Sequence, residues 1–148
     1  MVSSGVQPGT TSTFTSPRAA GWAIASAAAE SGMTGINAEE VAEIGVRAVI
    51  ARARAVAGTG PIYVSFDIDS LDPAFAPGTG TPEIGGLTTR EVQAILRGLK
   101  GLDIVGGDVV EVAPQYDATT NTAHAGAQML FEILSLMVFS PSIRGEAR

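Results

Sequence analysis

A buried strand that ends in two aspartates constrains the fold of this chain more than any other feature. Residues 62–66, Ile-Tyr-Val-Ser-Phe, have the apolar and β-branched character of a strand, and Asp67 and Asp69 follow them. Because side chains two residues apart on a strand share a face, these carboxylates can converge on one point. Burying isolated carboxylates is costly, and a hard divalent cation is the simplest group that would offset that cost. For Asp67 and Asp69 we therefore favour metal binding or catalysis over a structural role.

The segments around this strand alternate between helix and strand patterns, which predicts an α/β domain with parallel strands joined by crossover helices. Helices are expected over residues 17–30, 38–57, 88–98 and 121–139, the last with Asn121 as its cap, and strands over 33–36, 62–66 and 102–112. Residues 1–16 are expected to form a loop and residues 140–148 a frayed tail. About three strands result, which is few for an open parallel sheet. The 148 residues are enough for one domain.

The composition excludes several kinds of partner and location. A net charge of −6 argues against nucleic acid or an anionic membrane as the main partner. We find no apolar run of membrane-spanning length and no secretory leader, so we expect a cytoplasmic protein. Charged residues make up 16% of the chain, against about 25% in typical soluble domains. Either the sequence is simply rich in Ala and Gly, or part of its surface is covered by another subunit or by more of the same domain.

Four further residues are candidates for a site, because ligands of open α/β sheets bind beyond the carboxyl ends of the strands. Asp72 precedes a proline, so a turn role and a site role are equally open. Glu111 could cap a helix, form a salt bridge or contact a ligand. Asp108 lies within a predicted strand, and we expect it to pair with a backbone group. His124, the only histidine, is expected to be a structural or surface residue and not a ligand.

Four motifs closely resemble those of the ureohydrolase family, which comprises arginases, agmatinases and guanidino-acid amidinohydrolases. They are Ser-Phe-Asp-Ile-Asp-Ser-Leu-Asp-Pro at residues 65–73, Gly-Thr-Gly-Thr-Pro-Glu at 78–83, Gly-Gly-Leu-Thr at 85–88 and Val-Glu-Val-Ala-Pro at 110–114. The Pro-Glu pair after Gly-Thr-Gly-Thr is similar to agmatinases more than to arginases. The resemblance covers about residues 32–138.

This resemblance implies a three-layer α/β/α fold with a central parallel sheet and a site for two Mn²⁺ ions. The family binds these ions through four Asp and two His, of which Asp67 and Asp69 match two. By the same resemblance Glu111 orients the substrate guanidinium, and Thr81 lies near the substrate. The implied reaction is hydrolysis of a guanidino compound, of the agmatine or guanidinobutyrate class, to urea and an amine by a metal-activated hydroxide. A homo-oligomer, or association through an exposed sheet edge, is expected.

Two further family motifs, Gly-Gly-Asp-His and Asp-Ala-His-x-Asp, supply the other four metal ligands and do not occur in this sequence. The family's proton-shuttle histidine is also absent, so no complete catalytic set is identified. Residues 1–148 therefore resemble the C-terminal portion of a single ureohydrolase domain. Three functions stay open: an agmatinase-like hydrolase, a non-catalytic truncated remnant that acts as an interaction or structural partner, and a guanidine-binding module that uses Glu111.

Overall fold

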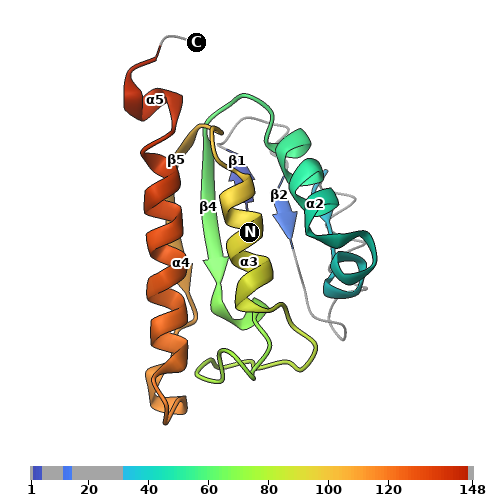
Figure 1. Cartoon of the computed structure of the whole chain (residues 1–148), viewed down its shortest axis with the longest axis vertical. Helices are drawn as coiled ribbons and strands as arrows, with labels where there is room; N and C mark the ends of the chain where they lie inside the picture. The colour runs from blue at the N-terminus through green and yellow to red at the C-terminus, as the bar shows by residue number, and fades with distance from the viewer. Residues whose placement is uncertain (1, 5–11, 15–31, 147–148) are drawn as a thin grey trace.

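A five-stranded sheet with helices packed on one face forms the core of the computed structural model, which describes residues 2–4, 12–14 and 32–146 (Figure 1). The strands are β1 Val2–Ser4, β2 Ser12–Phe14, β3 Thr34–Gly35, β4 Ile62–Asp67 and β5 Ile104–Val110, in the order β3-β2-β1-β4-β5. The helices are α2 Ala38–Ala57, α3 Thr89–Gly98, α4 Asn121–Met137 and α5 Pro141–Arg144. None of these helices is long and apolar enough to cross a membrane. The helix expected over residues 17–30 lies outside the described residues.

The sheet confirms the α/β class and corrects the strand count. β4 and β5 are parallel, as are β2 and β3, whereas β1 runs antiparallel to both of its neighbours. The prediction of a loop over residues 1–16 did not anticipate β1 and β2, and the expected three strands become five. Each of the two extra strands has only three residues, which is too short for a period-2 pattern to show.

One face of β4 is buried and the other is open to solvent, because side chains alternate along the strand. Ile62, Val64 and Phe66 are buried, while Tyr63 is exposed. On the buried side β5 has Gly107, where an added Cβ would lie 2.7 Å from the Cγ2 of Ile133 in α4. At Gly106 an added Cβ would lie 2.9 Å from the Cε2 of Tyr63, so close approaches at both positions explain the pair of glycines in β5.

The three long helices form one continuous layer over this buried face. Arg54 of α2 donates to the backbone oxygens of Gly98 and Lys100 at 3.0 and 3.1 Å, at the carboxyl end of α3. An added Cβ at Gly98 would come within 2.5 Å of the Cδ1 of Ile50, so only glycine allows α2 to lie this close. Figure 1 shows α3 and α4 side by side in front of the strands.

The capping residues of α2 and α3 are confirmed. The Asn37 Oδ1 accepts a hydrogen bond from the Glu40 backbone N–H at 2.8 Å. Thr88 and Glu91 form a complete capping box, in which each side chain accepts from the other residue's backbone N–H.

The predicted cap of α4 is wrong, because Asn121 is the first helical residue and Thr120 occupies the cap position with a φ of 64°. Asp117 takes over the capping role, since its Oδ2 accepts from the backbone N–H of Thr122 at 2.6 Å. Its carboxylate also accepts from the backbone N–H and the hydroxyl of Thr119, and these hydrogen bonds lower the pKa of Asp117.

Residues 140–146 are held in place instead of fraying as expected. Ser140 is fully buried and donates to the backbone oxygen of Ile104 at 2.7 Å. The hydroxyl of Ser142 donates to the Oδ2 of Asp103 at 2.7 Å, which fixes the start of α5 beside the first residues of β5. The polar composition of residues 140–146 predicted a frayed segment. The contacts that order it could not be predicted, because each polar group binds a partner far away in the sequence.

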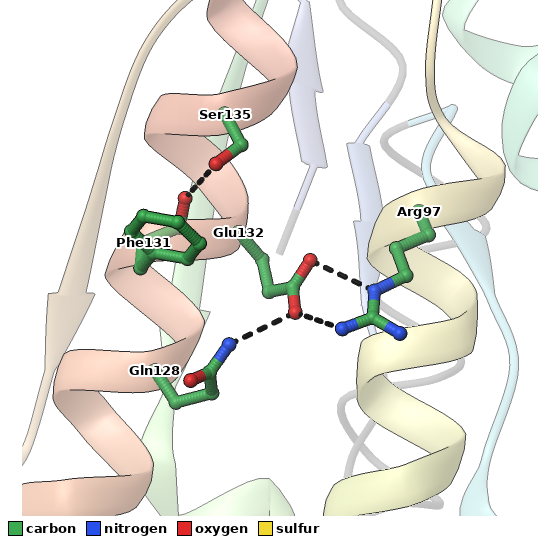
Figure 2. Close-up of polar contacts among 5 residues, drawn as sticks. All are labelled: Arg97, Gln128, Phe131, Glu132 and Ser135. Carbon is green, nitrogen blue, oxygen red and sulfur yellow. Dashed lines mark hydrogen bonds and ion pairs between the residues drawn. The ribbon is translucent and has the colours of Figure 1, made fainter.

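A buried carboxylate joins α3 to α4 (Figure 2). Arg97 donates from Nε to the Oε2 of Glu132 at 2.9 Å and from Nη2 to its Oε1. Gln128 adds a hydrogen bond to the same Oε1 at 3.0 Å. The Glu132 side chain is only 8% exposed, whereas that of Arg97 is 61% exposed. The guanidinium lowers the pKa of Glu132 and keeps this buried group charged.

We predict that Arg97→Ala lowers the free energy of unfolding by about 2–3 kcal/mol, because it leaves a buried charge with one amide partner. Glu132→Gln should lower the free energy of unfolding by only about 1 kcal/mol, because water can then hydrate the exposed guanidinium of Arg97. The lowered pKa of Glu132 means that its contribution is present above the ordinary Glu pKa and disappears as the pH falls through the lowered value. Arg97→Ala should therefore also weaken this acid dependence.

Urea denaturation followed by circular dichroism, repeated across acidic and neutral pH, measures both effects. Arg144→Ala is the matched control, because the Arg144–Glu146 pair is exposed on both sides and is expected to contribute less than about 0.5 kcal/mol. Equal destabilisation by Arg97→Ala and Arg144→Ala would show that the buried pair does not hold α3 to α4.

Candidate functional site

The site begins where β4 ends. Asp67 is the last residue of β4, and a 3-10 turn, η1 Ile68–Ser70, follows it and carries Asp69. The shared strand face expected for the two aspartates does not occur, because the chain has left the strand before Asp69. They remain neighbours nonetheless, since the Asp67 Oδ1 accepts a hydrogen bond from the Asp69 backbone N–H at 3.2 Å.

Partial burial perturbs the carboxyl of Asp67. Its pKa is raised to about 6, chiefly by desolvation, with further contributions from the negative charges of Asp69 and Glu111. The backbone N–H of Asp69 opposes the shift. Asp67, Asp69 and Glu111 thus lie at the carboxyl ends of β4 and β5. Their negative charges favour a bound cation or proton at this place.

Thr81 reaches this group from the loop that follows η1. Its hydroxyl donates to the Oδ2 of Asp69 at 2.7 Å. The loop is held at its base by Asp72, whose two carboxylate oxygens accept from the backbone N–H groups of Ala74 and Gly85, each at 2.8 Å. These hydrogen bonds lower the pKa of Asp72. Of the two roles left open for Asp72, a turn role and a site role, the structure therefore supports the turn role. Its carboxylate binds the backbone of the loop.

A second anchor holds the Gly-Thr-Gly-Thr segment against the start of α4. The backbone N–H of Gly78 donates to the hydroxyl of Thr122 at 2.7 Å, and its carbonyl accepts from the N–H of Ala113 at 2.8 Å. A Cβ at Gly78 would lie 2.6 Å from that of Asp117, so the loop can seat here only through glycine. Sequence inspection missed this anchor, although Asp117 and Thr119 are spaced as in a turn that an Asp side chain closes.

Glu111 directly follows β5 and has a backbone φ of 61°, in the left-handed region. This conformation costs a residue with a side chain roughly 1–2 kcal/mol. The side chain is exposed, and its charge is one of the causes of the raised Asp67 pKa. A strained, exposed carboxylate beside a half-buried acidic pair is the arrangement expected of a ligand-contacting residue.

Asp108 lies on β5 opposite Ser65, two residues before Asp67, and His124 lies on α4. Asp108 accepts hydrogen bonds from the hydroxyls of Tyr63 and Ser65 at 2.9 and 2.6 Å, so its partners are side chains and not the expected backbone group. His124 is exposed on α4, as expected of a surface residue. It borders an open pocket of about 370 Å³, with Phe75, Gln93 and Gln128 among the other lining residues, and none of the carboxylates of the site lines this pocket.

The donors of the site fit only part of a metal centre. Asp67 and Asp69 offer hard oxygen ligands whose mutual repulsion a divalent cation would relieve. Within the described ranges, however, no three His, Cys, Asp or Glu side chains are grouped closely enough to hold a metal ion. The two aspartates can therefore supply some ligands of a cation but not a full set.

The comparisons with known proteins agree with this geometry. The chain matches the arginase family over residues 6–135. Guanidinopropionase from Pseudomonas aeruginosa is 58% identical over 113 residues, covering 76% of this chain and 36% of that protein. A hypothetical agmatinase from Burkholderia thailandensis superposes with a TM-score of 0.71 at 46% identity, covering 78% of this chain and 36% of that one. Proclavaminate amidino hydrolase from Streptomyces clavuligerus gives 0.75 at 40% identity, covering 84% and 40%.

The chain therefore belongs to the arginase family, and its motifs predicted this membership. It spans about a third of the length of the curated relatives it matches. Those relatives with solved structures also confirm the arginase-like α/β fold.

The strain at Glu111 yields a prediction about stability. Glu111→Gly and Glu111→Ala both remove the carboxylate, but only glycine adopts a φ of 61° without cost. We expect the glycine variant to be about 1 kcal/mol more stable than the alanine variant in urea denaturation. At Ala94, exposed within α3, the order should reverse, with Ala94→Gly about 1 kcal/mol less stable than alanine. The same order at both positions would argue against strain at Glu111.

Proposed function

We propose that this chain carries the guanidinium-binding part of a ureohydrolase that converts a small guanidino compound to urea and an amine. The observation that carries the proposal is the placement of Asp67, Asp69 and Glu111 at the carboxyl ends of the paired strands β4 and β5. These residues lie in the motifs shared with the family, and the matched relatives are described as a guanidinopropionase, an agmatinase and an amidino hydrolase. The substrate we propose is a linear guanidine of the agmatine or guanidinobutyrate class.

Glu111 and Thr81 are the proposed substrate contacts. A guanidinium is a planar cation with N–H donors, and a carboxylate is its natural partner in both charge and shape. Glu111 supplies that carboxylate on a backbone held in a single unusual conformation. Thr81 donates its only hydroxyl hydrogen to Asp69, so the lone pairs of its oxygen remain to accept from a guanidinium N–H.

Asp67 and Asp69 are the proposed metal ligands, with Mn²⁺ as the cation of the family. A cation beside them would favour the ionised form of Asp67, whose pKa burial raises. When bound, manganese supplies the Lewis acidity that activates water for attack on the guanidinium carbon. The further ligands that such a site needs come, in this proposal, from outside the described residues. We place the reaction in the cytoplasm.

A second candidate is a non-catalytic partner protein that keeps the family fold. It is favoured by one observation, that no three metal-binding side chains are grouped in the described part of the chain. In this case the strained Glu111 would bind a guanidinium without turning it over.

Urea release separates the two candidates. The purified chain with Mn²⁺ should release urea from agmatine, 4-guanidinobutyrate or 3-guanidinopropionate if it is catalytic. Asp67→Asn combined with Asp69→Asn should reduce the rate to background, because both proposed metal ligands are lost. Glu111→Gln should weaken turnover about 10–100-fold, the equivalent of one charge-assisted hydrogen bond. Glu43→Gln, an exposed carboxylate of α2, is the control and should leave the rate unchanged.

Two results would contradict the catalytic proposal. One is a native chain with Mn²⁺ that releases no more urea than the double variant, which would rule out turnover by this chain without further ligands. The other is a Glu111→Gln variant as active as Glu43→Gln, which would remove Glu111 from the substrate contacts.

A further inference from the structure

The loop between η1 and α3 ends in a segment, residues 78–84, that is attached to the rest of the chain at two points. We call this segment the loop tip. The first attachment is Gly78, whose backbone N–H donates to the hydroxyl of Thr122 at 2.7 Å. The carbonyl of Gly78 also accepts from the backbone N–H of Ala113 at 2.8 Å. These two hydrogen bonds hold the first residue of the loop tip between the end of β5 and the start of α4.

The second attachment is a single hydrogen bond from the Thr81 hydroxyl to the Oδ2 of Asp69 at 2.7 Å. Within the described part of the chain, no other hydrogen bond joins residues 80–84 to their surroundings. Most of these residues are exposed, and Ile84 is 91% exposed. The loop tip therefore has few contacts that would resist its movement, which is typical of segments with low local stability.

Thr79 lies between the two attachments, and its hydroxyl is buried without a partner. The residue is 3% exposed, and its Oγ1 has no hydrogen-bond partner among the described residues. Its backbone N–H, by contrast, donates to the carbonyl of Pro77 at 3.1 Å. Nearly all buried polar side-chain atoms in proteins are hydrogen-bonded, so this exception calls for an explanation.

The unpaired hydroxyl of Thr79 opposes the hydrogen bonds that hold the loop tip closed. Burying a hydroxyl without a partner destabilises the conformation that buries it. When the loop tip opens, the hydroxyl reaches water and regains its hydrogen bonds, so the penalty applies to the closed position alone. A valine at position 79 has nearly the same shape and would carry no such penalty. Thr79 therefore shifts the equilibrium of the loop tip toward its open position.

We infer that Thr79 is a positioning residue that keeps the loop tip able to open, so that Thr81 can leave Asp69 and admit the guanidino ligand. Opening also frees the Oδ2 of Asp69, which Thr81 otherwise occupies. Figure 1 shows the loop between β4 and α3 extending beyond the carboxyl end of β4, where we place the ligand. The identity of the ligand rests on the proposed function, whereas the movement of the loop tip does not.

Amide hydrogen exchange of the full chain, followed by NMR, tests the inference without a ligand. The N–H of Gly78 is bound to Thr122 in the closed position, so its exchange rate measures opening of the loop tip. Thr79→Val removes the unpaired hydroxyl and should slow this exchange about tenfold, the effect of relieving one buried unpaired hydroxyl. The amide of Ala113, which donates to Gly78, should slow with it.

Thr122→Val is the matched opposite variant. Thr122 is also a fully buried threonine, but its hydroxyl accepts a hydrogen bond from the loop tip. Its loss should therefore speed exchange of the Ala113 amide about tenfold. Thr79→Ser keeps the hydroxyl and should exchange close to the native rate. The amide of Glu40, hydrogen-bonded at the start of α2, should be unchanged in all three variants, and thermal melts confirm their folding.

Two exchange results would overturn the inference. If Gly78 exchanges as fast in Thr79→Val as in the native chain, the hydroxyl does not oppose closing. If it exchanges faster in Thr79→Val, and Thr79→Ser restores the native rate, the hydroxyl stabilises the closed position and has a structural role.

Urea release separates this inference from the proposed reaction. Slower exchange in Thr79→Val, with no urea released by the native chain, would support the opening of the loop tip and contradict the reaction in this chain alone. If the native chain does release urea, Thr79→Val should lower kcat/KM about tenfold, because the ligand enters through the less populated open position. Equal kcat/KM for the two chains would overturn the inference and leave the reaction intact.

Discussion

The site depends on the one-sided burial of β4. Ile62, Val64 and Phe66 face the helix layer, and their burial fixes the strand's position along its whole length. Burying three such side chains contributes several kcal/mol, on the order of 1.5–3 kcal/mol each. The strand therefore ends at a defined place, and Asp67 is the residue found there. Its carboxyl is partly removed from water because the apolar packing continues through Ile68 on the next turn.

Around this fixed point the other site residues are placed by backbone constraints. Asp72 closes the base of the loop, and Gly78 seats its middle against Thr122, so Thr81 is brought to Asp69 from twelve residues away. Glu111 is positioned differently, by a left-handed backbone at the end of β5. Polar loops around the site are thus ordered by a few hydrogen bonds and by the absence of a side chain at Gly78, and not by apolar packing.

Structure that depends on residues close together in the sequence was predicted well. Contacts between residues far apart in the sequence were not predicted. The helices over residues 38–57 and 88–98 and their caps follow from short-range patterns, since Asn37 and Thr88 find partners three residues away. The pairing of β1 with β4, and the Ser142–Asp103 contact that orders residues 140–146, join residues far apart in the sequence. The motif predicted a site at the carboxyl end of β4. It could not show that Asp69 leaves the strand, because that depends on where η1 begins.

The left-handed backbone at Glu111 has a consequence for engineering and for natural variation. Selection for thermal stability alone would favour glycine or asparagine at this position, because both accept a positive φ readily. Selection for guanidinium recognition would oppose both, since neither carries a carboxylate. A library screened only for heat resistance would thus favour loss of the Glu111 side chain, and the resulting proteins would be more stable but would lack the carboxylate that we propose as the guanidinium contact.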